Sequence, residues 1–331
     1  MTRRLFLILR LLCAAGLMVW VLRRMHLEDA SAFSWSQIHL GWMAAAFAFG
    51  GFAVLALAGR WYCFLRVYNL RPRLSEILRL TFFADFFNLY FLGALGADGL
   101  RLLLLGRRHR RGAILGSLLM DHIGGLVGAG LIYAVFTRGS GLLPPSVQTA
   151  VDILLFAFVF VSFLGLGVLM RPALQHFIGV TRGMKVVTRP LAPMFADRPR
   201  HSWLFAGQAV ATLGMVSTYA AYWAGACAAG ARISLPQMLG VMPIVDLVAS
   251  LPITISGLGV RENLLVELLG RHHDLPATVA LPASLLGFAA VGLWGLIGGI
   301  WLLLWRRRTG AEVPLTTAPP PDHTTAKVAG S

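Results

Sequence analysis

The chain has 331 residues, of which 57% are hydrophobic and only 13% are charged. Soluble domains carry about 25% charged residues, so this composition excludes a soluble globular protein and indicates a polytopic membrane protein. The formal charge of +15 does not indicate nucleic-acid binding, because the basic residues lie in clusters beside apolar runs, as topology signals do.

Full membrane spans are predicted where the chain approaches the roughly 20 apolar residues that cross a bilayer. No small-residue cleavage site follows the N-terminal apolar run, so we expect an uncleaved span there and not a signal peptide. The six predicted spans are Leu5–Leu22, Leu40–Ala58, Ala113–Phe136, Val151–Met170, Trp203–Ala229 and Leu281–Trp305. The predicted fold is therefore all-α, with a single integral membrane domain over residues 1–308.

Two further apolar segments, near residues 80–105 and 238–269, are interrupted by Gly, Asp and Arg. If both crossed the membrane, the arginine clusters that follow the first segment and occupy residues 171–200 would lie outside, against the positive-inside rule. If each segment enters and returns on its own side, both clusters face the cytoplasm together with Arg306–Arg308. We therefore predict two oppositely oriented re-entrant hairpins, with both termini on the cytoplasmic side of a bacterial-type inner membrane.

Two halves that each contain a broken hairpin, in opposite orientations, resemble the inverted repeats of secondary transporters. The linker over residues 171–200 combines prolines, arginines and spaced apolar residues, which favours an interfacial cytoplasmic segment. Residues 309–331 are polar and contain a Pro-Pro-Pro run, which predicts a disordered cytoplasmic tail.

The first hairpin carries the run Asn88 to Arg101, in which Gly93 and Gly96 allow a tight reversal. Free amide groups at the ends of half-helices can hold an anion there. Asp98 and Arg101 are three residues apart and could pair on one helical face. The alternative is structural, with Asp98 as a helix cap and Arg101 among the lipid headgroups.

Asp85 lies earlier in the same segment and is flanked by aromatic residues. A carboxylate in that setting must be protonated, paired or directed at a cavity. Asn88 follows one turn later and could bond to Asp85. The pair is thus either a structural contact or part of a ligand site.

Asp121 and His122 interrupt a predicted span. An acidic residue at that depth is a functional candidate by default, and His122 could titrate near neutral pH, which would suit proton coupling. The structural alternatives are a salt bridge from Asp121 to a hairpin arginine and a packed, satisfied histidine.

The second hairpin places Asp246 before its break and an Arg261-Glu262 pair after it. The planar guanidinium of Arg261 suits a phosphate, and the two acids would orient or neutralise it. The alternative is a buried ion pair that fixes the hairpin. The residues predicted to break the helix here are Pro252, Gly257 and Gly259.

These motifs make the chain, over about residues 5 to 308, resemble the family of the lysylphosphatidylglycerol synthase transmembrane region, whose members are often called flippase-like. The matching residues are Arg60-Trp61, the set Asn88, Gly96, Asp98 and Arg101, then Asp121, and the run Pro252, Gly257, Gly259, Arg261 and Glu262. The chain departs from the family pattern at Leu92, Ala97, Ser256 and His122. His122 replaces an arginine, which removes a fixed charge beside Asp121.

The resemblance implies lipid handling at the cytoplasmic membrane. The leading hypothesis is a flippase-like lipid translocator that binds an anionic or phosphate-bearing headgroup between the two hairpins. The alternative is a non-transporting subunit that presents lipid to a glycosyltransferase or another lipid-modifying enzyme. A membrane-embedded transferase with Asp121 or Glu262 as a base ranks last, because no acid-base and nucleophile set accompanies them.

No synthase activity is expected from this chain, because only a short polar tail follows Arg308 where some family members carry an aminoacyl-transfer domain. No catalytic residue, metal site or cofactor is predicted, and the expected partner is membrane lipid.

Overall fold

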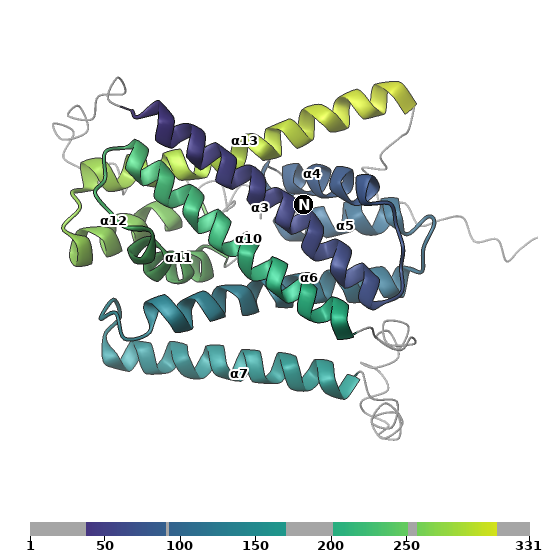
Figure 1. The fold of residues 1–331 in the computed structure, drawn as a ribbon, viewed down its shortest axis with the longest axis horizontal. Coiled ribbons are helices and arrows are strands. Elements are labelled where there is room, and N and C mark those ends of the chain that lie inside the picture. Colours follow the sequence, from purple (N-terminus) through teal and green to yellow (C-terminus); the bar gives the residue numbers. More distant parts are fainter. Residues whose placement is uncertain (1–37, 91–92, 170–200, 251–256, 310–331) are drawn as a thin grey trace, which may run out of the picture.

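The computed structural model describes residues 38–90, 93–169, 201–250 and 257–309, and the regular elements within those ranges are all helical (Figure 1). In chain order they are α3 (Leu40–Val67), α4 (Leu74–Tyr90), α5 (Gly93–Leu105), α6 (Arg111–Ile132), the π-helical turn η2 (Tyr133–Thr137), α7 (Pro145–Leu169), α10 (His201–Ala228), α11 (Leu235–Ala249), α12 (Val260–His273) and α13 (Ala277–Thr309). The predicted first span, the predicted linker over 171–200 and the tail from residue 310 lie outside the described residues.

Four described helices are long and apolar enough to cross a membrane. They are Leu40–Val67, Arg111–Thr137, Ser202–Ala228 and Ala277–Arg308, and each contains or closely matches a predicted span. Two shorter apolar stretches are Pro145–Ala157, in α7, and Leu235–Ala249. The prediction of an all-helical, multi-pass membrane protein is therefore confirmed. The largest boundary difference is in α3, which continues to Val67 beyond the predicted end at Ala58.

Helices α3 and α10 pack side by side and run in opposite directions (Figure 1). The start of α3 meets the end of α10, where the His39 N–H donates to the Ala228 carbonyl at 3.1 Å. The end of α3 meets the start of α10, where the Tyr62 and Trp203 rings lie 6.2 Å apart, edge to face. The two helices form the antiparallel centre of the bundle.

Among the described helices, the order of a long helix, two short helices and a long helix occurs twice. The first set is α3–α4–α5–α6 and the second is α10–α11–α12–α13. The short pairs are α4–α5, at the predicted first hairpin, and α11–α12, at the predicted second hairpin. They lie at opposite ends of the long helices (Figure 1). Each short pair also packs against the last long helix of the other set, since α4 contacts α13, and α11 contacts α6 and the turn η2 that continues it. An inverted repeat is expected to show both features, namely antiparallel α3 and α10 and short pairs that pack on the long helix of the other set.

The glycines of α13 allow α4 to pack closely against it. A Cβ on Gly298 would lie 2.1 Å from the Phe82 carbonyl oxygen, and one on Gly299 would lie 2.6 Å from the Phe86 ring. At the same contact the Tyr90 hydroxyl donates to the Gly292 carbonyl at 2.9 Å. This glycine-rich face is thus used for packing within the chain.

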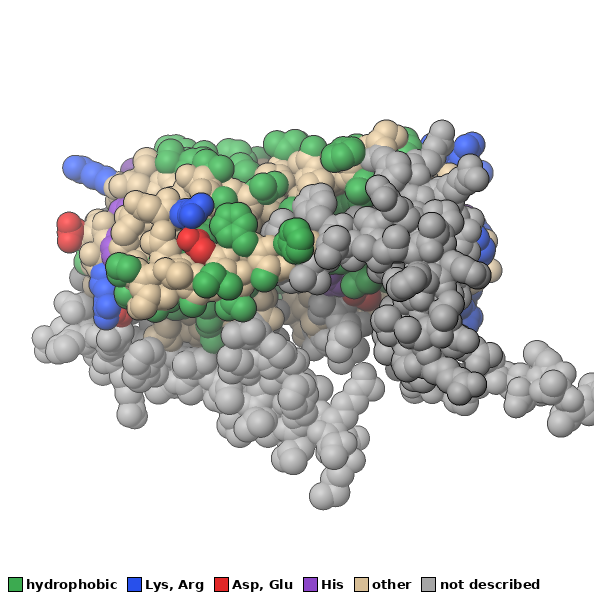
Figure 2. Space-filling model, turned by 90° about the horizontal axis from the view of Figure 1, so that it is seen from below, with side chains coloured by type: hydrophobic (Ala, Val, Ile, Leu, Met, Phe, Trp, Pro, Cys, Tyr) green, Lys and Arg blue, Asp and Glu red, His purple; other side chains and the backbone are tan. Residues whose placement is uncertain are grey.

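Charged side chains lie mainly towards the two ends of the visible face, with hydrophobic side chains between them (Figure 2). One end of the bundle is rich in arginine, where Arg66 stacks on Trp203 and Arg79 stacks on Trp305. At the other end Arg138 pairs with Asp152, and Arg271 pairs with Glu267. The predicted arginine clusters near residues 107–111 and 306–308 thus share one end, and the arginines over residues 66–79 lie there as well. The third predicted cluster, over residues 171–200, lies outside the described residues.

Candidate functional site

Asp121, on α6, lies at the centre of an ion-pair network in the first half. Arg60 Nε is 2.6 Å from Asp121 Oδ1, and Arg101 Nη1 is 3.3 Å from Asp121 Oδ2. The side chains of Asp121 and Arg101 are only 3% and 5% exposed. Three helices, α3, α5 and α6, therefore converge on one carboxylate. The predicted salt bridge from Asp121 to a hairpin arginine is present, with Arg60 as a second partner.

Arg101 is held from a second side by an aromatic ring. Its Cζ lies 4.8 Å from the centre of the Trp61 ring. Trp61 is fully buried, and its Nε1 donates to Ser117 Oγ at 3.2 Å. Arg101 Nε is buried and has no hydrogen-bond partner among the described residues. A guanidinium held in this way is positioned before any ligand arrives.

Asp98 extends the network towards the surface. Its Oδ1 is 3.8 Å from Arg101 Nη1, and its Oδ2 is 2.6 Å from His122 Nε2. The His122 side chain is 48% exposed, so this pair marks the outer edge of the network. The charges of Asp98 and Asp121 balance those of Arg60 and Arg101, so the network is electrically neutral without a bound ion. Protonation of His122 would add one positive charge.

The chain reverses at the start of α5. Gly93 has φ of +64°, a conformation that favours glycine, and it follows the undescribed residues 91–92. Gly96 lies inside α5, after the reversal. Of the two glycines predicted for this break, Gly93 is the one with left-handed backbone.

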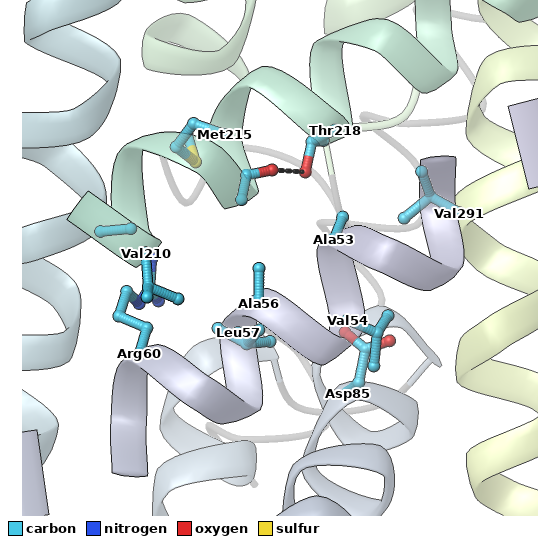
Figure 3. A pocket seen from close by; sticks show the side chains of 12 residues that line it. Ala53, Val54, Ala56, Leu57, Arg60, Asp85, Val210, Met215, Thr218 and Val291 are labelled. Atoms are coloured by element: carbon cyan, nitrogen blue, oxygen red, sulfur yellow. Dashed lines mark hydrogen bonds between the residues drawn. The ribbon is translucent and has the colours of Figure 1, made fainter. Parts of the chain in front are cut away.

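A cavity of about 180 Å³ lies between α3, α4, α10 and α13 (Figure 3). Apolar side chains form most of its wall, and Arg60 and Asp85 lie at opposite sides of it in this view. Asp85 Oδ2 is buried and has no hydrogen-bond partner among the described residues. Asn88, which the sequence offered as a possible partner of Asp85, is exposed on α4. Asp85 is therefore a carboxylate directed at a cavity, one of the three states predicted for it.

Two glycines shape the end of the second break. Gly257 has φ of +73° and Gly259 has φ of +83°. A Cβ on Gly257 would lie 2.7 Å from the Ala249 Cβ, so a larger residue there is both strained and crowded. Pro252, predicted to break the helix earlier, lies outside the described residues.

Glu262 caps α12 from within the protein. Its Oε2 accepts the Gly259 N–H at 2.6 Å, and its Oε1 accepts the Ser284 hydroxyl at 3.4 Å. The residue is completely buried. Its described bonds therefore tie the break in the second hairpin to α13.

Arg261 lies between two aromatic side chains. Its Cζ is 5.6 Å from the Tyr222 ring centre and 5.1 Å from that of Phe288. The charges of Arg261 and Asp246 interact, and the Tyr219 hydroxyl donates to Asp246 Oδ2 at 3.2 Å. Asp246 thus belongs to the same charged group as Arg261, and its role in neutralising Arg261 stays a prediction.

The structure does not bring all the predicted residues into one site. Arg60, Asp98, Arg101, Asp121 and His122 form one connected network. Asp246, Arg261 and Glu262 form a second group, which lies at the other end of the bundle with α11 and α12 (Figure 1). The cavity adjoins the first group through Arg60.

The family described as the lysylphosphatidylglycerol synthase TM region matches residues 7–299. The chain belongs to this family. A comparison with curated proteins found no match. Family membership confirms the resemblance drawn from the sequence motifs and supports an integral membrane protein of this type.

For this family member, sequence reasoning did not include Arg60 or Trp61 among its candidate site residues. The predicted span ended at Ala58, so Arg60 and Trp61 lay just beyond it. In the structure α3 continues to Val67, and the Arg60 side chain is only 11% exposed. The match of Arg60-Trp61 to the Arg-Trp of the family could have indicated that both residues belong to the site. Tyr222 and Phe288 carried no comparable signal, because their role depends on which helix faces Arg261.

Proposed function

We propose that this protein moves an anionic lipid between the leaflets of the membrane, with the headgroup passing through the cavity between α3, α4, α10 and α13. The observation that carries the proposal is this cavity, which places guanidinium and carboxylate groups inside a bundle of apolar helices. Charged groups at membrane depth are costly, and they are typical of substrate or ion pathways. The acyl chains would stay in the bilayer.

Arg60 is the proposed contact for the headgroup. It lines the cavity, and its ion pair with Asp121 engages Nε. A guanidinium has five N–H donors in a planar fork, so further donors are available for phosphate oxygens. Arg101 and Asp121 act as positioning residues, because both are almost completely buried and fix Arg60 from behind.

The opposed halves supply a way to open the cavity to either side. In transporters with inverted repeats, alternating access arises when one repeat rocks against the other around a central site. Here the antiparallel α3 and α10 both line the cavity. Asp85 belongs to the first hairpin, and Val291 lies on α13. Rocking of one half against the other would change the shape of this cavity directly.

The sequence contains no nucleotide-binding P-loop, so the proposed movement is downhill or coupled to an ion. Asp85, Asp121 and His122 are the proposed proton carriers. Asp85 is the best placed of these, because its carboxylate reaches the cavity and lacks a hydrogen-bond partner among the described residues.

The direct test is translocation of a headgroup-labelled phosphatidylglycerol in vesicles that contain the purified protein. Arg60→Gln should reduce the initial rate at least about tenfold, the loss expected when one charge-assisted contact disappears. Arg138→Gln is the control, because Arg138 also pairs with an aspartate but directly follows η2 and does not line the cavity. Equal rates in Arg60→Gln and the unchanged protein, both well folded, would overturn the proposed contact.

A second variant tests the cavity without removing a charge. The Thr218 side chain lines the cavity, and its hydroxyl donates to the Gly214 carbonyl one turn back (Figure 3). Thr218→Leu should fill the cavity and slow translocation. Thr149→Leu is the matched control, since Thr149 makes the same type of bond on the exposed face of α7. If the unchanged protein binds lipid but moves none, the alternative function of presenting lipid to an enzyme is favoured.

A further inference from the structure

A second pocket lies at the arginine-rich end of the bundle, away from the proposed translocation cavity. It has a volume of about 280 Å³. It is lined by Arg73, Ser75, Glu76, Arg79, Arg108, Trp301 and Trp305. The lining residues come from the start of α4, the connection between α5 and α6, and the end of α13. Both halves of the protein therefore build it, and it shares no residue with the cavity at Arg60.

The pocket has an excess of positive charge. Three arginines face one acidic residue, Glu76, so the lining carries more cation than it can neutralise. Arg79 Nε is buried and has no hydrogen-bond partner among the described residues. A buried donor without a partner carries a desolvation cost, which an incoming acceptor would remove. These two features favour an anionic ligand with several acceptor oxygens.

The tryptophans fix the shape of the pocket. The Arg79 guanidinium lies 5.0 Å from the centre of the Trp305 ring, which holds the cation in place. Trp301 packs edge to face on Phe82 and Phe83, with ring centres 5.6 and 6.0 Å apart. Rigid rings around a guanidinium reduce the conformational entropy that binding would cost.

The surroundings favour a lipid over a free ion. Tryptophan is enriched where membrane helices meet the headgroup layer, and both pocket tryptophans lie near the end of α13. Beside the pocket tryptophans, α13 also exposes the apolar side chains of Ile297, Ile300 and Leu304. Acyl chains could lie along these side chains while the phosphate occupies the pocket.

We propose that Arg73, Arg79 and Arg108, together with Trp301 and Trp305, form a binding site for the phosphate group of an anionic lipid headgroup. The site is separate from the translocation cavity and does not depend on the function proposed for it. Occupancy would link the base of the first hairpin to the end of α13, because the ligand contacts both.

The test is native mass spectrometry of the full chain in nanodiscs of phosphatidylcholine with added phosphatidylglycerol. Arg79→Gln should weaken retention of phosphatidylglycerol about tenfold, and Arg108→Gln should weaken it by a similar factor. Arg108 is exposed, so its substitution tests the site even where Arg79→Gln impairs folding. Arg307→Gln is the matched control, because Arg307 is an exposed arginine at the same end that does not line the pocket.

Inorganic phosphate, titrated separately, distinguishes the two sources of the ligand. Retention of phosphatidylglycerol that resists millimolar phosphate and falls only in the pocket variants supports the lipid site. Displacement of the lipid by phosphate in the unchanged protein assigns the pocket to the free ion and overturns the lipid assignment. Equal retention in all four proteins overturns the site itself. Each result is independent of the translocation rates measured with Arg60→Gln.

Discussion

The two broken hairpins have a similar structure, but their arginines lie in different surroundings. Each places an arginine after a glycine-rich break and stacks it on an aromatic residue of the long helix that opens its own half, Trp61 or Tyr222. These two aromatic residues lie equally far along α3 and α10. In the first hairpin Arg101 joins an ionic network that reaches the cavity through Arg60. In the second, Arg261 does not line the cavity.

The difference shows how one backbone arrangement can serve two purposes. The second break is closed by its own carboxylate, since Glu262 caps the helix that carries it and bonds to α13. The first network is shared among three helices and ends at the half-exposed His122. Ion pairs between different helices can change partners when those helices move. A helix cap such as Glu262 stabilises only the hairpin that contains it. We therefore expect function to depend on the first network and stability on the second cap.

The largest effect is expected from Asp121→Asn. It would leave Arg60 and Arg101 without their common partner in a buried position, and breaking a buried pair costs about 3–5 kcal/mol. Thermal unfolding in detergent should show the loss of stability, and the vesicle assay should show lost translocation. Asp152→Asn is the control, because Asp152 pairs with the exposed Arg138. Unchanged unfolding in Asp121→Asn would contradict the central position of this carboxylate.

A smaller loss of stability is expected from Glu262→Ala. The variant would leave the Gly259 N–H buried without an acceptor, at a cost of about 1–3 kcal/mol. The translocation rate per folded molecule should stay close to that of the unchanged protein. Glu262→Gln, which keeps one acceptor oxygen, should recover part of the stability. If Glu262→Ala abolished translocation but left thermal unfolding unchanged, the second hairpin would serve function and not stability, contrary to this comparison.

The smallest effect is expected from His122→Asn. The His122 side chain is 48% exposed, and exposed ion pairs contribute less than about 1 kcal/mol. Unfolding should therefore shift only slightly, while the buried Arg60–Asp121 pair remains. Translocation measured across a pH gradient sharpens the comparison. Weaker dependence on the pH gradient, with unfolding almost unchanged, would support His122 as a proton carrier, whereas the same dependence as in the unchanged protein would remove it from the proposed carriers.

Much of the architecture could be predicted from local sequence. Apolar runs of sufficient length predicted the helices that became α3, α6, α10 and α13, because backbone hydrogen bonds must be satisfied within the membrane. Glycines at 93, 257 and 259 predicted breaks, and each adopts a positive φ that other residues resist. The clustering of arginines predicted that their segments share one end of the bundle.

The partners of the charged side chains were decided only by the tertiary structure. The sequence offered a hairpin arginine as one possible partner of Asp121, but the packing of α3 against α6 added Arg60 to Arg101. The sequence placed Glu262 beside Arg261, yet the turn at Gly259 directs Glu262 to a backbone N–H. Hydrophobicity and backbone preference are properties of a short segment, so the sequence itself determined the helices and their breaks. Which charges meet depends on how distant helices pack, and only the folded chain fixes that.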